Sequence, residues 1–439
     1  MRRINLEKCP QIELPLDQVH LSDNNPKLHP ERQLAMLEAS FRRFRHMSPV
    51  LVAKSGEVIA GHARVIVSRR MGLESIPAIV LPHLSESERR AYRIADNAIA
   101  AKGQWSIQLL TSELELLTSV ELGFDPIEIG FETGEVDSLI LGAGTEPVST
   151  PVAAEPDRSS PAVARVGDIF NIGPHAVACG DSKDPATFAA VLNGRKAEAV
   201  ISDQPWNLAA RFISGKGRVR HPDFVECAGE MSSGEFKAFT HTVVANQAAH
   251  CIPGALMFQF IDWRSVDVMI AAGKKWVGEL VNMCVWVKQS GRMGSPWRSQ
   301  HELVCVFRAP GGKSRDNVKM GIYGRNRTNV WRYDAPSAFG AQREKLQLHP
   351  TCKNESMIAD AILDCTDRNA LVLDAFLGSG TTILAAHMTG RVGVGIELDP
   401  HYVDLAVSRI AETTGEEPVH QSGKTFTALA KERSNEVEH

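Results

Sequence analysis

The chain has 439 residues, of which 43% are hydrophobic and 23% charged, and it carries a formal net charge of −4. This length allows two or three domains with at least one large core, whereas no window approaches the roughly 20 uninterrupted apolar residues of a membrane helix. The N-terminal segment lacks the apolar stretch of a secretory signal, and the eight cysteines form no C-x-x-C pair, so we expect a cytoplasmic protein with reduced thiols and no metal site.

The front part of the chain alternates strand-like and helix-like patterns. The segment IELPLDQVHL has an extended pattern, and PERQLAMLEASFRRF has helical spacing that places Leu34, Leu37 and Phe41 on one face. The stretch PVLVAKSGEVIAGHARVIVSRRMGL predicts a strand hairpin that turns at residues 55–56, followed by a helix.

From about Ile12 to Leu117 these patterns, together with LSESERRAYRIADNAIA, resemble the small α+β ParB-like N-terminal domain. In that family the helix after the hairpin begins at a glycine, carries an arginine and contacts phosphate or nucleotide through its N-terminus. The corresponding motif here is GHAR at residues 61–64. Partition proteins usually have an acid and paired arginines there and a helix-turn-helix unit afterwards, and neither is evident. We therefore favour an accessory domain over residues 1–141, with a helical extension and no chemistry of its own; a nucleotide-switch protein is the alternative.

Two segments carry little apolar pattern. The stretch GAGTEPVSTPVAAEPDRSSPAVA is rich in Pro, Ser, Thr and Ala, which predicts a flexible linker over residues 142–165. The final stretch EEPVHQSGKTFTALAKERSNEVEH has little to bury, which predicts a frayed polar tail over residues 414–439. The second domain then occupies residues 166–413.

A glycine-rich turn and an acid form the first candidate site in this second domain. In LVLDAFLGSGTTILAAHMTG an apolar strand ends at Asp374, and a Gly-Ser-Gly turn leads into a helix near Thr381. Gly378 and Gly380 let the backbone turn tightly and approach a ligand, although glycines that serve only packing give the same pattern. The next strand ends at Glu397, 19 residues after Gly378, which is the spacing of an acid that accepts ribose hydroxyls.

A third strand, AEAVIS, ends in the motif DQPW at residues 203–206. An acid, a proline and a large aromatic within four residues form an ordinary turn in some proteins and a site in others. In an open parallel sheet the strand ends meet at one crevice. We therefore expect Asp203 and Trp206 to face whatever the glycine turn binds.

Together these features resemble the amino-methyltransferases that use S-adenosylmethionine on DNA bases, in the β-class order with the Asp-Pro-Pro-Tyr-like motif first. The resemblance extends from about Val166 to Ile410 and implies an α/β, Rossmann-like, doubly wound domain with a mostly parallel sheet. HAVACGDSKD stands where the family's Gly-Asp contacts the cofactor adenine, and HPTCKNESM is similar to its His-Pro-Thr-x-Lys-Pro element near the cofactor's methionine carboxylate. The S-adenosylmethionine-binding residues that the resemblance implies are Asp181, Thr351, Lys353, Asp374, Phe376, Gly378, Gly380, Thr381 and Glu397.

The resemblance also implies that residues Asp203, Gln204, Pro205 and Trp206 are catalytic. Hydrogen bonds from the target amine to Asp203 and to the backbone carbonyl of Gln204 would localise the amine lone pair, so that a methyl group held in line transfers directly. Trp206 would stack on a base flipped out of the duplex. The family usually has proline at position 204; glutamine keeps the carbonyl but loses the fixed φ of proline. Asn354 in place of the second proline of the HPTxKP element is a milder change.

The segment from Lys288 to Lys345 is predicted to recognise the target. It contains twelve basic and four acidic residues, a local net charge of +8, with two tryptophans and two tyrosines among them. Such a segment suits phosphate binding and base-edge reading, although a solvated surface gives a similar composition. The candidate DNA-binding residues are Arg292, Arg298, Arg325, Arg327 and Arg332.

We therefore expect a site-specific methyltransferase for an exocyclic amine of double-stranded DNA, with adenine N6 favoured over cytosine N4 because an aspartate heads the motif. The alternative from another class is a DNA-binding or scaffolding protein that keeps the fold while Gln204 has weakened or silenced it. A homodimer and a restriction partner are both compatible with the sequence, which indicates neither the recognition site nor the oligomeric state.

Overall fold

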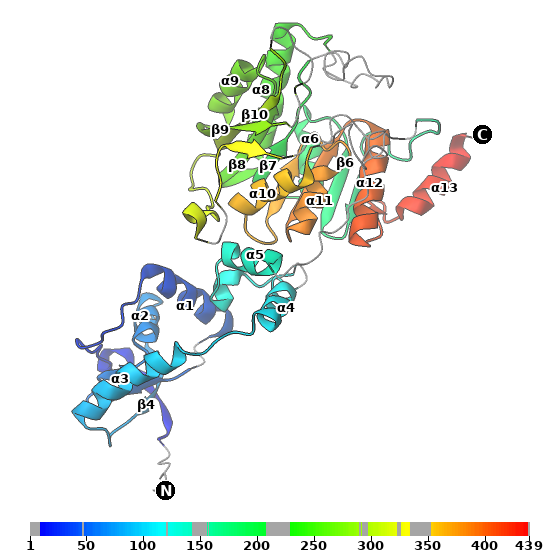
Figure 1. Cartoon of the computed structure of the whole chain (residues 1–439). Coiled ribbons are helices and arrows are strands. Elements are labelled where there is room, and N and C mark those ends of the chain that lie inside the picture. The colour runs from blue at the N-terminus through cyan, green and yellow to red at the C-terminus, as the bar shows by residue number, and fades with distance from the viewer. Residues whose placement is uncertain are drawn as a thin grey trace. The chain divides into compact units, whose positions relative to one another are not determined.

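The computed structural model describes residues 9–45, 48–119, 122–142, 156, 158–207, 229–288, 291, 297–322, 326–333 and 353–437. The chain divides into two compact units, Met1–Ala143 and Gly144–His439 (Figure 1). The boundary falls inside the segment that the sequence predicts as a linker. None of the helices in the described ranges is long and apolar enough to cross a lipid bilayer.

The first unit contains a four-stranded sheet with the order β1-β4-β2-β3. Strands β1 and β4 are antiparallel, β2 and β4 are parallel, and β2 and β3 form a hairpin. The elements described in this unit are β1 (Gln11–Pro15), η1 (Leu16–Gln18), α1 (Glu31–Phe44), β2 (Val50–Val52), β3 (Val58–Ala60), α2 (His62–Arg70), β4 (Ser75–Val80), α3 (Glu86–Ala100), α4 (Ile107–Leu117), η2 (Pro126–Ile129) and α5 (Thr133–Gly142).

The patterns of the front part form the elements that the sequence predicts. The hairpin turns at residues 55–56, where Gly56 has φ +85° and its N–H donates to the carbonyl of Ala53 at 2.9 Å. Leu34 and Phe41 of α1 are buried, because one apolar face of this helix packs against α2.

The described part of the second unit contains a ten-stranded sheet with the order β11-β9-β10-β8-β7-β12-β13-β6-β5-β14. The five strands β8, β7, β12, β13 and β6 run parallel, while β9, β10, β5 and β14 pair antiparallel. The elements described in this unit are β5 (Ile169–Ile172), β6 (His175–Cys179), α6 (Pro185–Leu192), β7 (Ala197–Ser202), α8 (Ser233–Ala249), β8 (Cys251–Ile261), α9 (Val266–Trp276), β9 (Glu279–Val287), β10 (His301–Arg308), η3 (Lys319–Gly321), β11 (Val330–Arg332), α10 (Glu355–Cys365), β12 (Leu371–Asp374), α11 (Thr381–Met388), β13 (Val392–Glu397), α12 (Pro400–Thr414), β14 (Val419–His420) and α13 (Phe426–Val437).

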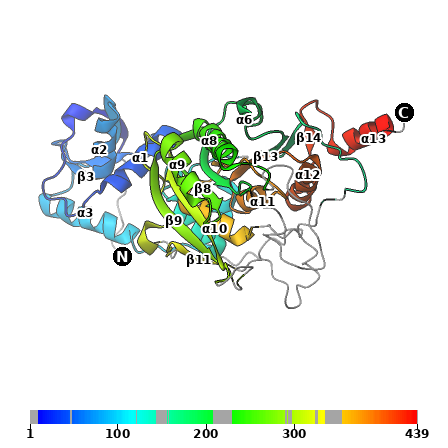
Figure 2. The ribbon, with the colours of Figure 1, turned by 90° about the horizontal axis from the view of Figure 1, so that it is seen from above.

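Helices cover both faces of this sheet (Figure 2). One apolar cluster joins α6, α8 and α9 to one set of strand side chains, and two others join α10, α11 and α12 to the alternate set. Along β12, for example, Leu371 and Leu373 belong to the first cluster and Val372 to the second, because successive side chains of a strand point to opposite faces. The central parallel strands are therefore apolar on both faces, and the predicted doubly wound α/β domain is confirmed.

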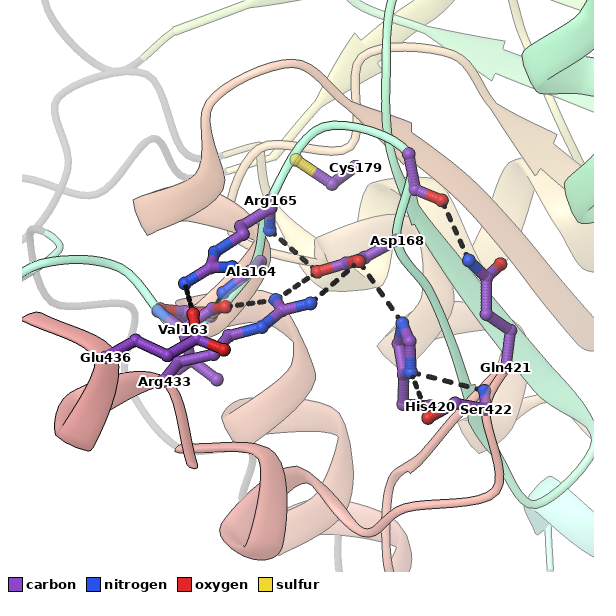
Figure 3. Close-up of polar contacts among 12 residues, drawn as sticks. Val163, Ala164, Arg165, Asp168, Cys179, His420, Gln421, Ser422, Arg433 and Glu436 are labelled. Carbon is purple, nitrogen blue, oxygen red and sulfur yellow. Dashed lines mark hydrogen bonds and ion pairs between the residues drawn. The ribbon is translucent and has the colours of Figure 1, made fainter. Parts of the chain in front are cut away.

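The prediction of a frayed tail over residues 414–439 is wrong. Strand β14 pairs with β5, and Phe426 and Leu429 of α13 join the apolar cluster beneath α12. Both Arg433 and the imidazole of His420 contact the carboxylate of Asp168 (Figure 3). The segment has too few apolar residues for a periodic pattern, so its attachment by strand pairing and by this buried acid leaves little trace in the sequence.

The end of the predicted linker also differs from expectation. The backbone N–H groups of Val163 and Ala164 donate to the carboxylate of Asp404 at 2.6 and 2.8 Å, and Arg158 pairs with Asp399 at 2.5 Å. Residues 158–165 are thus fastened to α12 and to the loop before it. The Pro- and Ser-rich composition that suggests a flexible chain does not reveal these contacts to acids far away in the sequence.

Candidate active site

Four acids follow four adjacent parallel strands at their carboxyl ends. β7 pairs with β12, β12 with β13, and β13 with β6. Asp203, Asp374, Glu397 and Asp181 stand at or just after the ends of these strands, in that order across the sheet. Because the carboxyl ends of parallel strands share one edge, the loops open side by side. The expected juxtaposition of the glycine turn and the DQPW motif is therefore present.

The glycine turn after β12 is braced by Asp374. Its carboxylate accepts a hydrogen bond from the N–H of Phe376 at 2.9 Å and one from the hydroxyl of Thr382 at 2.5 Å. Gly378 and Gly380 have φ +53° and +91°, in the left-handed region that favours glycine. Burial raises the pKa of Asp374 to about 7. Both oxygens accept hydrogen bonds from the turn and the start of α11, so this acid holds the turn's shape, and its contact with the cofactor stays a prediction.

Glu397 lies directly against the same turn. One carboxylate oxygen accepts from the N–H of Gly378 at 2.8 Å and the other from the N–H of Asp399 at 2.9 Å. Its neighbour across the sheet is the loop after β6, where the N–H of Gly180 donates to the carbonyl of Glu397 at 2.9 Å. The carboxylate of Asp181 accepts from the N–H of Lys183 at 2.8 Å. The glycine turn, Glu397 and Asp181 thus lie on three adjacent loops at this edge of the sheet.

Two residues beside Gly378 and Gly380 complete the turn. Phe376 is half-buried and its ring centroid lies 6.1 Å from that of Phe239 on α8. Thr381 is buried in the first turn of α11. Thr351, the remaining cofactor residue implied by the resemblance, lies outside the described residues.

Three polar atoms of the DQPW motif are buried and have no hydrogen-bond partner among the described residues: Oδ1 of Asp203, Oε1 of Gln204 and Nε1 of Trp206. Buried polar groups normally pair, so an unpaired set at a strand end is a feature of ligand sites. Asp203 and Trp206 therefore hold an acceptor and a donor without partners among the described residues at this edge of the sheet, whereas Pro205 presents no backbone donor.

Lys353 pairs with the acid of the DQPW motif. Its ammonium lies between two carboxylates, 2.8 Å from Oδ2 of Asp203 and 2.8 Å from Oε2 of Glu302 on β10. Lys288, at the end of β9, pairs with the other oxygen of Glu302. The sequence predicts Lys353 beside the cofactor's methionine carboxylate, and this stays a prediction; among the described residues its ammonium pairs with Asp203 and Glu302.

The charges of this cluster determine the protonation of its members. Burial raises the pKa of Asp203, against the attraction of Lys353 and with a further increase from Glu302. Burial alone would raise the pKa of Glu302, but Lys353 and Lys288 outweigh it and lower this pKa to about 2. The two carboxylates likewise raise the pKa of Lys353 to about 12 in spite of its burial. Glu302 and Lys353 therefore remain charged at neutral pH.

Aromatic rings surround this ammonium. Nζ of Lys353 lies 4.9 Å from the ring centroid of Phe260, 5.4 Å from that of Trp206 and 5.5 Å from that of Trp286. Such distances allow cation–π attraction. Glu302 is not among the predicted site residues and Lys288 is counted among the DNA-facing cations, although both are buried, Glu302 within β10 and Lys288 directly after β9. Charged residues within an apolar strand pattern are the signal that could have identified them.

The predicted DNA-binding arginines separate into two groups. Arg327 forms ion pairs with Asp360 and Asp364 of α10, so its charge is already compensated within the unit, which differs from the prediction. Arg332 is exposed at the end of β11, and Arg298 is exposed ahead of β10. Arg292 and Arg325 lie outside the described residues.

The sequence is similar to known DNA methylases and to a ParB-like protein. The family model N6_N4_Mtase, described as DNA methylase, matches residues 197–408. The chain is 37% identical over 103 residues to the type II methyltransferase M.ScaI of Streptomyces caespitosus, covering 23% of this chain and about a third (34%) of that protein. It is 30% identical over 236 residues to the type II methyltransferase M.HpaI of Haemophilus parainfluenzae, covering 50% of this chain and 69% of that protein. A third relative, the ParB-like nuclease domain-containing protein YnaK of Escherichia coli K12, is 33% identical over 84 residues, covering 19% of this chain and 97% of YnaK.

Proposed function

The chain belongs to the N6/N4 DNA methylase family and carries a ParB-like region, and on this premise we propose that it transfers a methyl group from S-adenosylmethionine to an exocyclic amine of a base in double-stranded DNA. We propose adenine N6 as the target, ahead of cytosine N4, because an aspartate heads the motif. The observation that carries this proposal is the pairing of β12 with both β7 and β13. This pairing brings the glycine turn, Glu397 and Asp203 to one edge of the sheet.

The residues at the glycine turn fit S-adenosylmethionine. Gly378 and Gly380 have no side chains to keep a ligand from the backbone, and none of the described residues outside the turn has an atom within 4 Å of where a Cβ of Gly378 would stand. The carboxylate of Glu397 offers acceptors for ribose hydroxyls. Bound there, the cofactor would supply an electrophilic methyl group. Asp181, on the neighbouring loop, would contact the adenine part.

On the other half of the edge, Asp203 would accept a hydrogen bond from the target amine through the oxygen that lacks a partner among the described residues. The backbone carbonyl of Gln204 would accept a second one, so that the nitrogen lone pair is drawn out of conjugation and directed at the methyl group. Trp206 would stack on the flipped base. The proton that the amine loses after transfer can pass to Asp203 if the acid is ionised when the base binds.

DNA would approach on the side of the segment between β9 and β11. Exposed Arg298 and Arg332 are suited to phosphate contacts. Arg292 and Arg325 stay predicted contacts.

Incubation of the full chain with tritiated S-adenosylmethionine and unmethylated DNA tests the proposal. We expect label in the DNA and none with the Asp203→Ala variant, which should still bind the cofactor. Sequencing of modified bases in DNA from expressing cells would then identify the target base and its context. Label on cytosine alone would contradict the adenine assignment, and equal labelling by Asp203→Ala would contradict the assigned site.

The competing candidate is a methyltransferase-like DNA-binding protein that has lost activity. The observation that favours it is glutamine at position 204, where the family usually has proline. Wild-type chain that binds cofactor and DNA but leaves every DNA unlabelled would support this second function.

A further inference from the structure

Both chain neighbours of Asp203 hydrogen-bond to the same helix, α8. The side-chain amide of Gln204 donates through Nε2 to the hydroxyl of Thr240 at 3.0 Å. On the other side of the acid, Gln247 donates through Nε2 to the hydroxyl of Ser202 at 2.8 Å. All four side chains are at most 1% exposed. The acid is thus held between two buried polar contacts to one rigid element.

The contact at Ser202 continues into the sheet. The amide oxygen of Gln247 accepts from Nε2 of Gln259 on β8 at 2.7 Å, and Gln259 is also fully buried. Since the amide of Gln247 donates at one end and accepts at the other, its orientation is determined. Leaving one member of a buried polar network without its partner costs more than the bond contributes net. The hydrogen bonds of these side chains therefore connect α8 and β8 to the end of β7.

The contact of Gln204 with Thr240 bears on the backbone conformation at position 204. In the proposed reaction the backbone carbonyl of this residue must point steadily at the target amine. Proline would hold the backbone by its fixed φ, and glutamine has no such restraint. Pro205 already disfavours the helical region for the residue before it, and the anchored amide of Gln204 restricts the remaining freedom from the side-chain end.

We propose that Gln204 is a positioning residue whose buried amide, anchored on Thr240, restrains the loop after β7 in place of the ring of a proline. The catalytic consequence rests on the proposed function, whereas the restraint itself rests on the contacts of Ser202, Gln204, Thr240 and Gln247. The same contacts offer an explanation of how the motif tolerates glutamine.

A double-mutant cycle in the full chain tests this inference. Thr240→Val keeps the shape of the side chain and removes the hydroxyl, and we expect it to lower kcat about tenfold, as for one net hydrogen bond, with KM for DNA and affinity for S-adenosylmethionine unchanged. In the Gln204→Pro background the same change should alter kcat by no more than about twofold, because no amide depends on the hydroxyl. Thr242→Val is the matched control, since the hydroxyl of this exposed threonine of α8 donates to the carbonyl of Ala238 within its own helix.

A loss of kcat that is equal in both backgrounds would overturn the inference, because Thr240 would then act through packing alone. Hydrogen–deuterium exchange of residues 203–207 provides a readout that needs no activity. We expect Thr240→Val to speed exchange there in the natural sequence and not in the Gln204→Pro background. If the wild-type chain methylates nothing, this pattern still decides the inference, so its failure is distinguishable from failure of the proposed function.

Discussion

The carboxyl ends of the parallel strands form one edge of the sheet, and its two halves are held in different ways. The half with the glycine turn and Glu397 is called the cofactor half, and the half with the DQPW motif is called the target half, after the roles proposed for them. At the glycine turn, acids accept hydrogen bonds mainly from backbone N–H groups of the same or the next loop, as Asp374 does from Phe376 and Glu397 from Gly378. At the DQPW motif, the acid is held by side chains from distant parts of the chain. Lys353, which lies just before α10, pairs with Asp203.

This difference has an energetic meaning. Backbone donors of a tight turn are in place as soon as the turn forms, so the cofactor half depends on local geometry. Burial of the charges in the target half costs desolvation energy, which is offset only where each charge has its partner. We therefore expect substitutions in the target half to disturb stability and chemistry together, and substitutions in the cofactor half to disturb binding alone.

The largest effect is expected at Glu302. Glu302→Gln leaves Lys288 and Lys353 without their shared counter-ion, and breaking such a buried pair costs about 3–5 kcal/mol. Denaturant unfolding at pH 7 measures the loss, with Glu279→Gln as control, because that acid is in an exposed pair with Arg308. Equal unfolding of both variants would show that the buried charges do not set the stability of this half.

The same acid predicts a dependence of stability on pH. Its pKa falls to about 2 on folding from an ordinary value of 4.5, so its contribution to stability is complete above pH 4.5 and is lost as pH falls toward 2. The wild-type chain should therefore lose more stability across this window than Glu302→Gln. Parallel losses in the two proteins would contradict the assigned charge state.

The contrast also explains what the sequence can predict. The turn at 375–380, its strand and its helix follow from local apolar pattern and glycine spacing, and Glu397 follows from its distance along the chain. The partner of Asp203 does not, because Lys353 is far from this acid along the chain and only the folded structure brings the two together. Likewise α13 is held by Phe426, Leu429 and the contact of Arg433 with Asp168, too few apolar groups for a periodic signal.

The next largest effect is expected on the rate of methyl transfer, at Asp203 in the target half. Asp203→Asn keeps the size of the side chain but removes its charge, and we expect kcat for methyl transfer to fall by about 100- to 1000-fold, as for other preorganised polar groups at a reacting centre. Affinity for S-adenosylmethionine, measured by calorimetry, should not change. Loss of cofactor affinity in this variant would contradict the separation of cofactor binding and methyl transfer between the two halves.

At the cofactor half the expected effect is smaller and falls on binding. Glu397→Gln retains an oxygen for the N–H of Gly378 but loses the acceptor for the N–H of Asp399 and the charge that strengthens a bond from a hydroxyl, so we expect the Kd for S-adenosylmethionine to rise about tenfold. At saturating cofactor kcat should be close to that of the wild type. The exposed acid Glu416 supplies the control substitution, and an unchanged Kd would remove Glu397 from the site.

The smallest effect is expected among the arginines that face solvent. Arg332→Ala should weaken DNA binding a few-fold and reduce the slope of log affinity against log salt by about 0.9, the value for one phosphate contact. Arg327→Ala should leave that slope unchanged and instead lower the stability of the unit, because its guanidinium is paired with Asp360 and Asp364. Fluorescence anisotropy with labelled duplex at several salt concentrations measures the slopes. Equal slopes for Arg332→Ala and wild type would show that Arg332 makes no phosphate contact.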